Sequence, residues 1–566
     1  MPNATKRSAV ELLKESSRQL RGTIADELAA GGTQVSDGAN SLLKFHGSYE
    51  QYDRDTATAR KQQKLEKEYG FMLRVRMPGG RLTAAQYLAL DELADRYGHA
   101  TLRVTSRQTI QFHGVVKGNL KPTIVAIHRT LLTTQAACGD VVRNVTTTAA
   151  PRRDAPHARL EADARLLSSA LLPRTRAYHE IFLDEAPSES SGHEDEPLYG
   201  ALYLPRKFKI GLALPQDNSI DVLTNDLGLV AVWQGEALRG YNVAVGGGLG
   251  MTHNRADTYP RLASLIGSVG PDELIALTEA VIRVQRDHGG RADRKRARLK
   301  YLVDDAGLPW VREAIGRELG HALAAPLPVP AFEVPELLGW HEQGDGAWWL
   351  GVPVPSGRIA DVGAVRLRTA LRELVRRYGI DPVLTAQQDV LLTNIPPRLR
   401  SAVTRLLRRH GVTLAGEITP LARWALACVA LPTCGLALTE AERVRAPLLA
   451  DIEAVLGRHG LLRERISLRV TGCPNGCARS YGGDIGLVGR VPGAYAVFVG
   501  GDFEGTRLSF KLLERVPEAR IGAVLEPLLA AFAQQRRRGE GFGDFCHRLG
   551  PEAALALVEG AQASAA

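Results

Sequence analysis

The chain has 566 residues, of which 45% are hydrophobic and 23% charged, so its composition is that of a globular protein with room for three or four domains. Its N-terminus has no apolar core of signal-peptide length, and the longest uncharged apolar run, at 424–439, is shorter than the about 20 residues that span a membrane. The net charge of +9 would suit nucleic acid, but the notable basic residues lie in strand-like segments, so we favour a polyanionic ligand. We therefore expect a cytoplasmic protein that binds neither a membrane nor nucleic acid.

The first predicted elements form a ferredoxin-like order. Residues 6–30 have the pattern of a helix, and the polar segment that follows, up to residue 70, is expected to be irregular and to wrap over the fold. Next come a strand at 71–77, a helix at 83–97, strands at 100–105 and 109–115, a helix at 120–134 and a strand near 139–145. This β-α-β-β-α-β order is typical of ferredoxin-like folds.

The same order recurs later in the chain. It is predicted as a strand at 349–355, a helix at 362–378, strands at 382–385 and 389–394, and a helix at 396–410. The copies share motifs: G-G-R-L at 79–82 parallels S-G-R-I at 356–359, and T-S-R-Q-T-I at 105–110 parallels T-A-Q-Q-D-V at 385–390. A second pair of repeats, Y-N-V-A-V-G-G-G-L-G at 241–250 and Y-A-V-F-V-G-G-D-F-E at 495–504, indicates that longer segments are duplicated too.

The duplication predicts a mixed α+β and α/β architecture with internal symmetry. Two ferredoxin-like halves pair in one domain, two larger α/β domains accompany it, and a functional site is expected at their junction. The predicted boundaries are 1–70 for a wrapping or partner-docking segment, 71–135 and 336–420 for the two halves, and 136–335 and 421–566 for the larger domains.

Four of the six cysteines form two pairs in a short stretch. Cys428 and Cys434 are separated by five residues, and Cys473 and Cys477 by three. Thiolates in this pattern bind soft metals, either as an iron–sulfur cluster or as a structural zinc. Structural zinc usually takes two tight pairs, whereas the wide first pair suits a larger cluster, so we favour a cluster and zinc stays open.

A second group of candidate residues is cationic. Lys207 and Lys209 stand two positions apart in a strand-like apolar segment, so both side chains are expected on one face. Arg74 and Arg76 have the same spacing. Two charges in an apolar strand need partners, so an anionic ligand is favoured over a solvated surface role.

These motifs together resemble a known family. The C-x5-C and C-x3-C pairs, with C-P-N-G-C-A-R at 473–479, are similar to those of the sulfite and nitrite reductases that carry siroheme beside a 4Fe–4S cluster. The resemblance extends over nearly the whole chain through D-G-A-N-S-L-L-K-F-H-G at 37–47, S-R-Q-T-I-Q-F-H-G at 106–114, R-N-V at 143–145 and Y-L-P-R-K-F-K at 203–209. Within the family it is greatest to the hemoprotein (beta) subunits of assimilatory NADPH-sulfite reductases.

The resemblance implies roles for individual residues. It implies that the cluster ligands are Cys428, Cys434, Cys473 and Cys477, of which Cys477 also ligates the siroheme iron. It implies that the substrate pocket is lined by Arg74, Arg143, Lys207 and Lys209. The residues implied to hold siroheme carboxylates, or to lie beside them, are Arg103, Arg107, Gln111, His113 and Asn475. The chain departs from the family pattern after R-N-V, where T-T-T stands in place of a cysteine that some relatives have.

The implied activity is the six-electron reduction of sulfite to hydrogen sulfide, in the assimilation of sulfur for cysteine biosynthesis. A siroheme nitrite reductase, which forms ammonia, is the alternative within the family. A zinc-stabilised nucleic-acid-binding protein is the alternative from another class, because it would also account for the cysteines and the basic charge.

The electron donor is expected to be another protein. G-G-G-L-G at 246–250 lacks the third glycine and the following acidic residue of a dinucleotide loop, and the chain shows no flavodoxin segment. An FAD- and FMN-containing NADPH-flavoprotein subunit and a ferredoxin are the two candidates. The polar N-terminal 70 residues are the candidate segment for docking this donor.

Overall fold

The structure, a computed structural model, describes residues 7–185 and 196–565. Lys6, where the predicted N-terminal helix begins, lies outside these residues. The chain forms two compact units, of which the first contains Met1–Gly248, Ala263–Gly351 and Arg358–Val412, and the second contains Leu249–Leu262, Val352–Gly357 and Thr413–Ala566. Among the described helices, none has the length and apolar composition needed to cross a membrane.

The N-terminal segment contains more structure than the sequence predicts. Its elements are α1 Ala9–Ser16, α2 Ile24–Ala29, α3 Asp37–Leu43, β1 Ser48–Tyr52 and α4 Ala57–Gln62. The prediction of one helix over 6–30 is wrong, because Arg18, Gln19 and Leu20 have positive φ angles and turn the chain between α1 and α2. Leu20 is buried in this turn and its N–H donates to Ser17 Oγ at 3.0 Å, so tertiary burial overrides the helix propensity of the segment.

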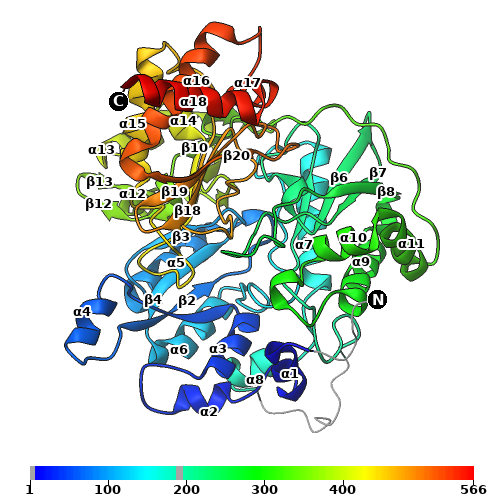
Figure 1. The fold of residues 1–566 in the computed structure, drawn as a ribbon. Helices are drawn as coiled ribbons and strands as arrows, with labels where there is room; N and C mark the ends of the chain where they lie inside the picture. Colours follow the sequence, from blue (N-terminus) through cyan, green and yellow to red (C-terminus); the bar gives the residue numbers. More distant parts are fainter. Residues whose placement is uncertain (1–6, 186–195, 566) are drawn as a thin grey trace. The chain divides into compact units, whose positions relative to one another are not determined.

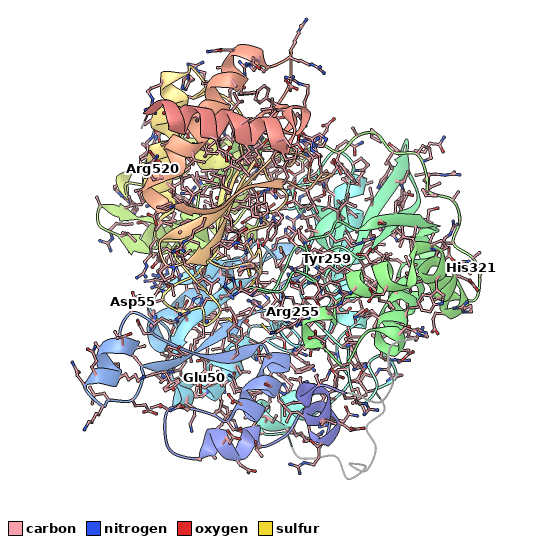
Figure 2. The ribbon with its side chains drawn as sticks, viewed as in Figure 1. Glu50, Asp55, Arg255, Tyr259, His321 and Arg520 are labelled. Carbon is pink, nitrogen blue, oxygen red and sulfur yellow. The ribbon has the colours of Figure 1, made fainter. Side chains whose placement is uncertain are left out.

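The rest of this segment is not irregular either. β1 pairs antiparallel with β2 (Tyr69–Arg74), so the segment adds an edge strand to the first sheet. Glu50 on β1, labelled in Figure 2, accepts a hydrogen bond from the N–H of Val35 at 2.9 Å and so ties the preceding loop to the strand. The sequence did not predict this strand because its two buried residues, Ser48 and Gln51, are polar.

The first ferredoxin-like half has the predicted order through its second helix. It consists of β2, α5 Ala84–Tyr97, β3 Leu102–Val104, β4 Ile110–Val115 and α6 Lys117–His128. Thr83 caps α5 and forms a capping box with Gln86, which explains why this helix begins where the sequence predicts. The strand predicted near 139–145 is wrong, because within the described residues this segment forms only an isolated bridge, between Val142 and Phe208.

The second ferredoxin-like half repeats this order. It consists of β9 Gly339–Glu342, β10 Trp348–Val352, β11 Arg358–Ile359, β12 Asp361–Val362, β13 Val365–Arg366, α12 Leu367–Tyr378, β14 Pro382–Leu384, β15 Val390–Ile395 and α13 Arg400–Arg409. Both helices begin later than predicted. A hairpin of β12 and β13 precedes α12, and a short 3-10 helix, Pro397–Leu399, precedes α13.

The two halves exchange short strands. β11 of the second half pairs with β3 of the first half in the five-stranded sheet β1-β2-β4-β3-β11. In return, Arg81 of the first half forms a bridge with Val383 in β14 of the second half. Arg81 and Arg358 hold equal positions in G-G-R-L and S-G-R-I, so the exchange is reciprocal and makes one body of the two halves.

The longer segments fold around two similar sheets, of four strands in the first unit and five in the second. In the first unit the elements are α7 Ala155–Ala170, α8 Ala177–Leu183, β5 Ile210–Ala213, β6 Leu227–Gln234, β7 Ala237–Val245, β8 Ser264–Val269, α9 Leu274–His288, α10 Leu299–Ala306 and α11 Leu308–Leu319. In the second unit they are α14 Pro420–Arg423, β16 Ala425–Ala427, α15 Arg445–Arg458, β17 Leu468–Thr471, β18 Ile485–Val491, β19 Ala494–Val499, β20 Phe510–Pro517, α16 Ile521–Gln535, α17 Phe542–Leu549 and α18 Pro551–Ala565.

Four strands of each sheet match, and the second sheet has one additional strand, β16, which pairs in parallel with β17. β5 pairs in parallel with β6, as β17 does with β18, and antiparallel pairing then continues to β8 and to β20. A single 3-10 turn and a helix of 15 residues, α9 or α16, follow the last strand of each sheet. α9, α10 and α11 pack together beside the first sheet (Figure 1), and α15 and α16 bury the second. The predicted duplication is thus confirmed.

Arg368 on α12 forms a buried ion pair between the two ferredoxin-like halves. Its guanidinium donates to Asp91 and Asp95 on α5 at 2.6 and 2.5 Å, and its side chain is 7% exposed. Arg368→Met leaves Asp91 buried with Arg372 as its remaining ion partner, so we expect the free energy of unfolding in urea to fall by about 1–3 kcal/mol. Arg376→Met, on an exposed position of the same helix, is the control and should change it by less than about 0.5 kcal/mol. Equal effects of the two substitutions would contradict this role.

Candidate functional site

One face of the first sheet carries a row of polar side chains. Arg74 on β2 is in register with Gln111 on β4, Gln111 with Arg103 on β3, and Arg103 with Arg358 on β11. Residues in register on neighbouring strands point to the same face, so four strands direct these side chains to one side of the sheet. Arg103 and Gln111 are buried, which is costly without polar or anionic partners. This polar row brings together three predicted site residues, and Arg358 joins them.

His113 lies on the same face as Gln111, two residues further along β4. It is 3% exposed, and neither ring nitrogen has a hydrogen-bond partner within the described part of the chain. Burial, followed by the charges of Arg358 and Arg103, lowers the pKa of His113 well below its usual range, so the ring is neutral at physiological pH. A buried neutral imidazole with two unsatisfied nitrogens fits a polar ligand on this face.

Arg107, in contrast, is turned toward the protein itself. Its Nη1 donates to Asn225 Oδ1 at 2.5 Å, and its Nη2 donates to the backbone oxygens of Asn144 and Ile210 at 2.5 and 3.1 Å. These bonds tie the turn between β3 and β4 to the loop after Arg143 and to the start of β5. The structure therefore gives Arg107 a role in positioning loops, and its contact with a cofactor carboxylate stays a prediction.

The loop that contains Cys138 orients two of the predicted substrate cations. Arg74 Nη1 donates to Cys138 Sγ at 2.8 Å, and Arg143 Nε donates to the backbone oxygen of Gly139 at 2.8 Å. Burial lowers the pKa of Arg143, and the charge of Arg74 acts in the same direction, so the two guanidinium groups lie within electrostatic range of each other. Two like charges held this close favour an anion between or beside them.

Lys207 and Lys209 precede β5 on an extended stretch of backbone. Phe208 between them is buried, whereas both lysines are only partly buried, as alternation along an extended segment requires. Burial, followed by the charges of Arg206 and Lys209, lowers the pKa of Lys207 well below its usual range, and Arg143 acts in the same direction. The structure thus groups both lysines with Arg143, and Lys207 releases a proton more readily than a solvated lysine.

A buried ion network supports both cationic segments. Asp140 is 1% exposed and receives two hydrogen bonds from Arg294, at 2.5 and 2.8 Å. Lys14 on α1 and Arg206, which precedes Lys207, lie 3.9 and 3.8 Å from the same carboxylate. Burial raises the pKa of Asp140, but Arg294, Lys14 and Arg206 together outweigh it and hold this pKa below its usual range. One carboxylate therefore connects the N-terminal helix to both segments that carry the predicted substrate cations.

The second unit carries the four clustered cysteines. β16 and β17 are parallel neighbours, so Cys428, directly after β16, and Cys473, just after β17, lie at the same edge of the sheet. The N–H of Gly472 donates to Cys428 Sγ at 3.2 Å. Burial raises the pKa of Cys473, and the other three thiols act in the same direction, so the four sulfur atoms lie within electrostatic range of one another.

The C-P-N-G-C turn of the second cysteine pair is held by close packing. Gly476 has a φ of +62°, and a Cβ there would lie 2.8 Å from the ring of Tyr481, so only glycine fits. Tyr481 OH donates to the backbone oxygen of Pro474 at 3.0 Å, and the N–H of Met251 donates to the same oxygen at 2.9 Å. Asn475 is partly buried within this fixed turn.

The four thiols fit a cluster better than a single zinc ion. Tetrahedral zinc needs its thiolates within about 4 Å of one another. The wide spacing of Cys428 and Cys434 suits a larger cluster instead. Cys473 is buried, but Cys477 is exposed, so its thiol is accessible to a second group besides a cluster.

Family comparisons identify both kinds of segment. A model described as a nitrite/sulfite reductase ferredoxin-like half domain matches residues 63–128 and 341–410. A model described as a nitrite and sulphite reductase 4Fe-4S domain matches residues 162–323. Residues 162–323 lie in the first long segment and contain no cysteine, so this match identifies the duplicated fold and not the cluster ligands themselves.

Known proteins match the chain along almost its whole length. The sulfite reductase (NADPH) hemoprotein beta-component of Xanthomonas campestris pv. campestris is 47% identical over 549 residues, covering 96% of each chain. That of Myxococcus xanthus is 46% identical over 546 residues, again covering 96% of each chain. The solved structure of the Mycobacterium tuberculosis NirA protein is 25% identical, with a TM-score of 0.78, over 97% of this chain and 98% of that one. This agreement confirms the predicted fold class.

Two residues of the site were not predicted from the sequence. Arg358 lies in S-G-R-I, whose likeness to G-G-R-L was visible, but only the exchange of strands brings it beside Arg103. Asp140 lies in a segment that was predicted as a strand, and its partners come from three distant parts of the chain. A lone aspartate after a cysteine carries no local signal of this role.

The cysteine assignment predicts different outcomes for three Cys→Ser variants. Cys477→Ser should lose the link between heme and cluster and all multi-electron activity, because an alkoxide replaces a thiolate poorly in iron–sulfur chemistry. Cys138→Ser and Cys546→Ser should keep both cofactors, since neither cysteine belongs to the cluster of four. Iron analysis and absorption spectra of the purified variants measure this. A folded but colourless Cys138→Ser protein would show that the ligands are wrongly assigned.

Proposed function

Because the chain belongs to the nitrite and sulfite reductase family, we propose that it is the hemoprotein subunit of an assimilatory sulfite reductase, acting in the cytoplasm. It reduces sulfite to hydrogen sulfide with six electrons. The observation that carries the proposal is the presence, in one chain, of four clustered thiols and of a partly buried group of cations suited to an oxyanion. The relatives, which are sulfite reductase hemoproteins, favour sulfite over nitrite as the substrate.

The residues present fit siroheme and a 4Fe–4S cluster. The cluster ligands are Cys428, Cys434, Cys473 and Cys477, and the exposed thiol of Cys477 would also hold the siroheme iron. The polar row and the unsatisfied nitrogens of His113 suit the carboxylates of siroheme. When bound, the two groups supply the electron storage that a six-electron reduction requires.

The chain's own cations bind and orient the oxyanion. Arg74 and Arg143 are fixed by the loop of Cys138, so their positive charges are in place before the substrate arrives. Each oxygen of sulfite leaves as water, so protons must be delivered beside it. Lys207, whose pKa burial and its cationic neighbours lower, is the proposed proton donor.

The electron donor is proposed to be a flavoprotein subunit that is itself reduced by NADPH. The relatives named above are beta-components of NADPH-dependent enzymes, which supports a second kind of subunit. The N-terminal segment remains the proposed docking segment. Its helix α1 also has a structural role, because Glu11 and Lys14 are buried and Lys14 lies beside Asp140.

Sulfide formation by the purified protein, with reduced methyl viologen as donor, tests the proposed function. We expect heme absorption bands and one sulfide for every six electrons consumed. A protein loaded with both cofactors that forms no sulfide would overturn the proposal, and a higher kcat/KM for nitrite would favour the alternative within the family.

Lys209→Met tests the recognition of a dianion. A fixed charge interacts about twice as strongly with a dianion as with a monoanion at equal distance. The kcat/KM for sulfite should therefore fall more than the kcat/KM for nitrite. We expect kcat/KM for sulfite to fall about 5- to 150-fold, with siroheme content unchanged. Lys61→Met, at an exposed position, is the control. If Lys209→Met reduced both anions as fast as the parent protein, Lys209 would have no place in the site.

Asp140→Asn tests the ion network behind the substrate cations. Loss of the carboxylate charge leaves Arg294, Lys14 and Arg206 to repel one another, and this should displace the loops that carry Arg143 and Lys207. We expect kcat/KM for sulfite to fall about 10- to 100-fold while iron and siroheme content stay normal.

Asp287→Asn removes an exposed carboxylate of the same unit and serves as the control for this variant. An Asp140→Asn protein with the parent's kcat/KM would restrict this network to a role in stability.

A further inference from the structure

A cavity of about 250 Å³ lies where the two ferredoxin-like halves of the first unit meet. It is lined by residues from three segments, 81–86 of the first half, 151–165 at the start of α7, and 381–394 of the second half. None of the residues of the polar row is among them. The charged residues of its lining are Arg81, Arg152, Arg153, Arg165, Glu161 and Asp381.

The duplication explains why an arginine stands in this cavity. Arg81 and Arg358 hold equal positions in the two halves, and each reaches a strand of the other half, Arg358 at Arg103 and Arg81 at Val383. The cavity is therefore the internal counterpart of one end of the polar row. Arg81 reaches the cavity through the same strand exchange that brings Arg358 into the polar row, whereas Arg152, Arg153 and Arg165 come from the segment that leads into α7.

The cavity differs from the polar row in the strand residues that line it. Val383 stands where the first half has Arg103, and by the same register Thr393 stands where it has His113. Both residues line the cavity. A site with these smaller, uncharged residues, and with a volume below the about 300 Å³ at which organic ligands are usually enclosed, suits a small anion and not a large cofactor.

The arginines of the cavity are only partly balanced by carboxylates. Glu161 serves two of them, since its oxygens lie 3.3 Å from Arg81 Nε and 2.6 Å from Arg165 Nη2. Arg81 is 14% exposed, and its buried Nε makes no hydrogen bond within the described residues. Arg153 Nη2 donates to Asn394 Oδ1 at 2.7 Å, and its Nε lies 3.3 Å from Asp345.

Arg152 has no hydrogen bond or ion pair in the described ranges, although Asp154 and Asp217 lie within electrostatic range of it. Burial lowers the pKa of Arg81, Glu161 opposes this, and Arg165 and Arg153 act with burial. The positive charges of the cavity therefore repel one another, and an anion would relieve this repulsion.

We infer that this cavity is a binding site for a small tetrahedral dianion of the phosphate and sulfate class. Four guanidinium groups face two carboxylates in its lining, and even with Asp345 beside Arg153 a net positive charge remains for an anion. Guanidinium groups present paired N–H donors that match such oxyanions. Because the lining comes from three segments, a bound dianion would hold the two ferredoxin-like halves and α7 together. The site is independent of the proposed reaction.

Calorimetric titration of the holoprotein with inorganic phosphate, at constant ionic strength kept by chloride, tests this inference. We expect saturable binding and a rise in Tm with phosphate. Arg152→Ala combined with Arg165→Ala, both at exposed positions, should weaken phosphate binding at least about tenfold and remove the rise in Tm. The same variant should keep the parent's rate of sulfite reduction.

Two further variants separate this cavity from other cationic surfaces. Arg96→Ala combined with Arg129→Ala removes two exposed arginines of the first half outside the cavity and should leave phosphate binding unchanged. Lys209→Met, which alters the proposed substrate site, should also leave it unchanged. The inference would be overturned if no phosphate binding were detected at about ten times the cellular phosphate concentration. It would also be overturned if Lys209→Met abolished phosphate binding and the Arg152/Arg165 variant retained it.

Discussion

The structure of the first unit depends on how the charges of its buried arginines are balanced. A buried cation is stable only where other groups receive its hydrogen bonds or balance its charge. Arg298 is balanced by Asp226 and Arg294 by Asp140, and both pairs are bidentate. Arg143 instead donates to a backbone carbonyl, which accepts its hydrogen bond but leaves its charge in place. The fully paired arginines stabilise the scaffold, whereas the charge of Arg143 is not balanced in this way.

The two ferredoxin-like halves differ in the charge that their strands carry. Strand exchange brings Arg358 beside Arg103, where it extends a polar row that Gln111 and the neutral His113 complete. The corresponding strands of the other half carry apolar or uncharged residues, as at Val383, and pack into a small core cluster with Trp349. One fold, used twice, therefore carries charged residues on the strands of one half and apolar or uncharged residues on the corresponding strands of the other. Divergence of a few side chains, without a change of topology, was sufficient for this.

Local patterns explain which predictions succeeded. The capping box of Thr83 and Gln86 acts within one helical turn, and the spacing of the two cysteine pairs places thiols at the ends of two strands, so both features can be recognised in the sequence. The N-terminal helix was predicted wrongly because burial of Leu20 bends the chain against its helix propensity. The strand β1 gave no signal, because the residues that it buries are polar.

The sequence by itself therefore determined the duplication, the ferredoxin-like order, the four thiols and the identity of the candidate cations, because each of these is a local or repeated pattern of residue types. Only the tertiary structure decided which cations work together. Arg107 is turned toward the loops of Asn144 and Asn225, and Arg358 enters the polar row through an exchanged strand. Asp140 joins the loops that carry the candidate cations, because charges from distant segments meet at this one buried carboxylate. Electrostatic interactions depend on distance in space and on burial, and neither is recorded in the order of residues.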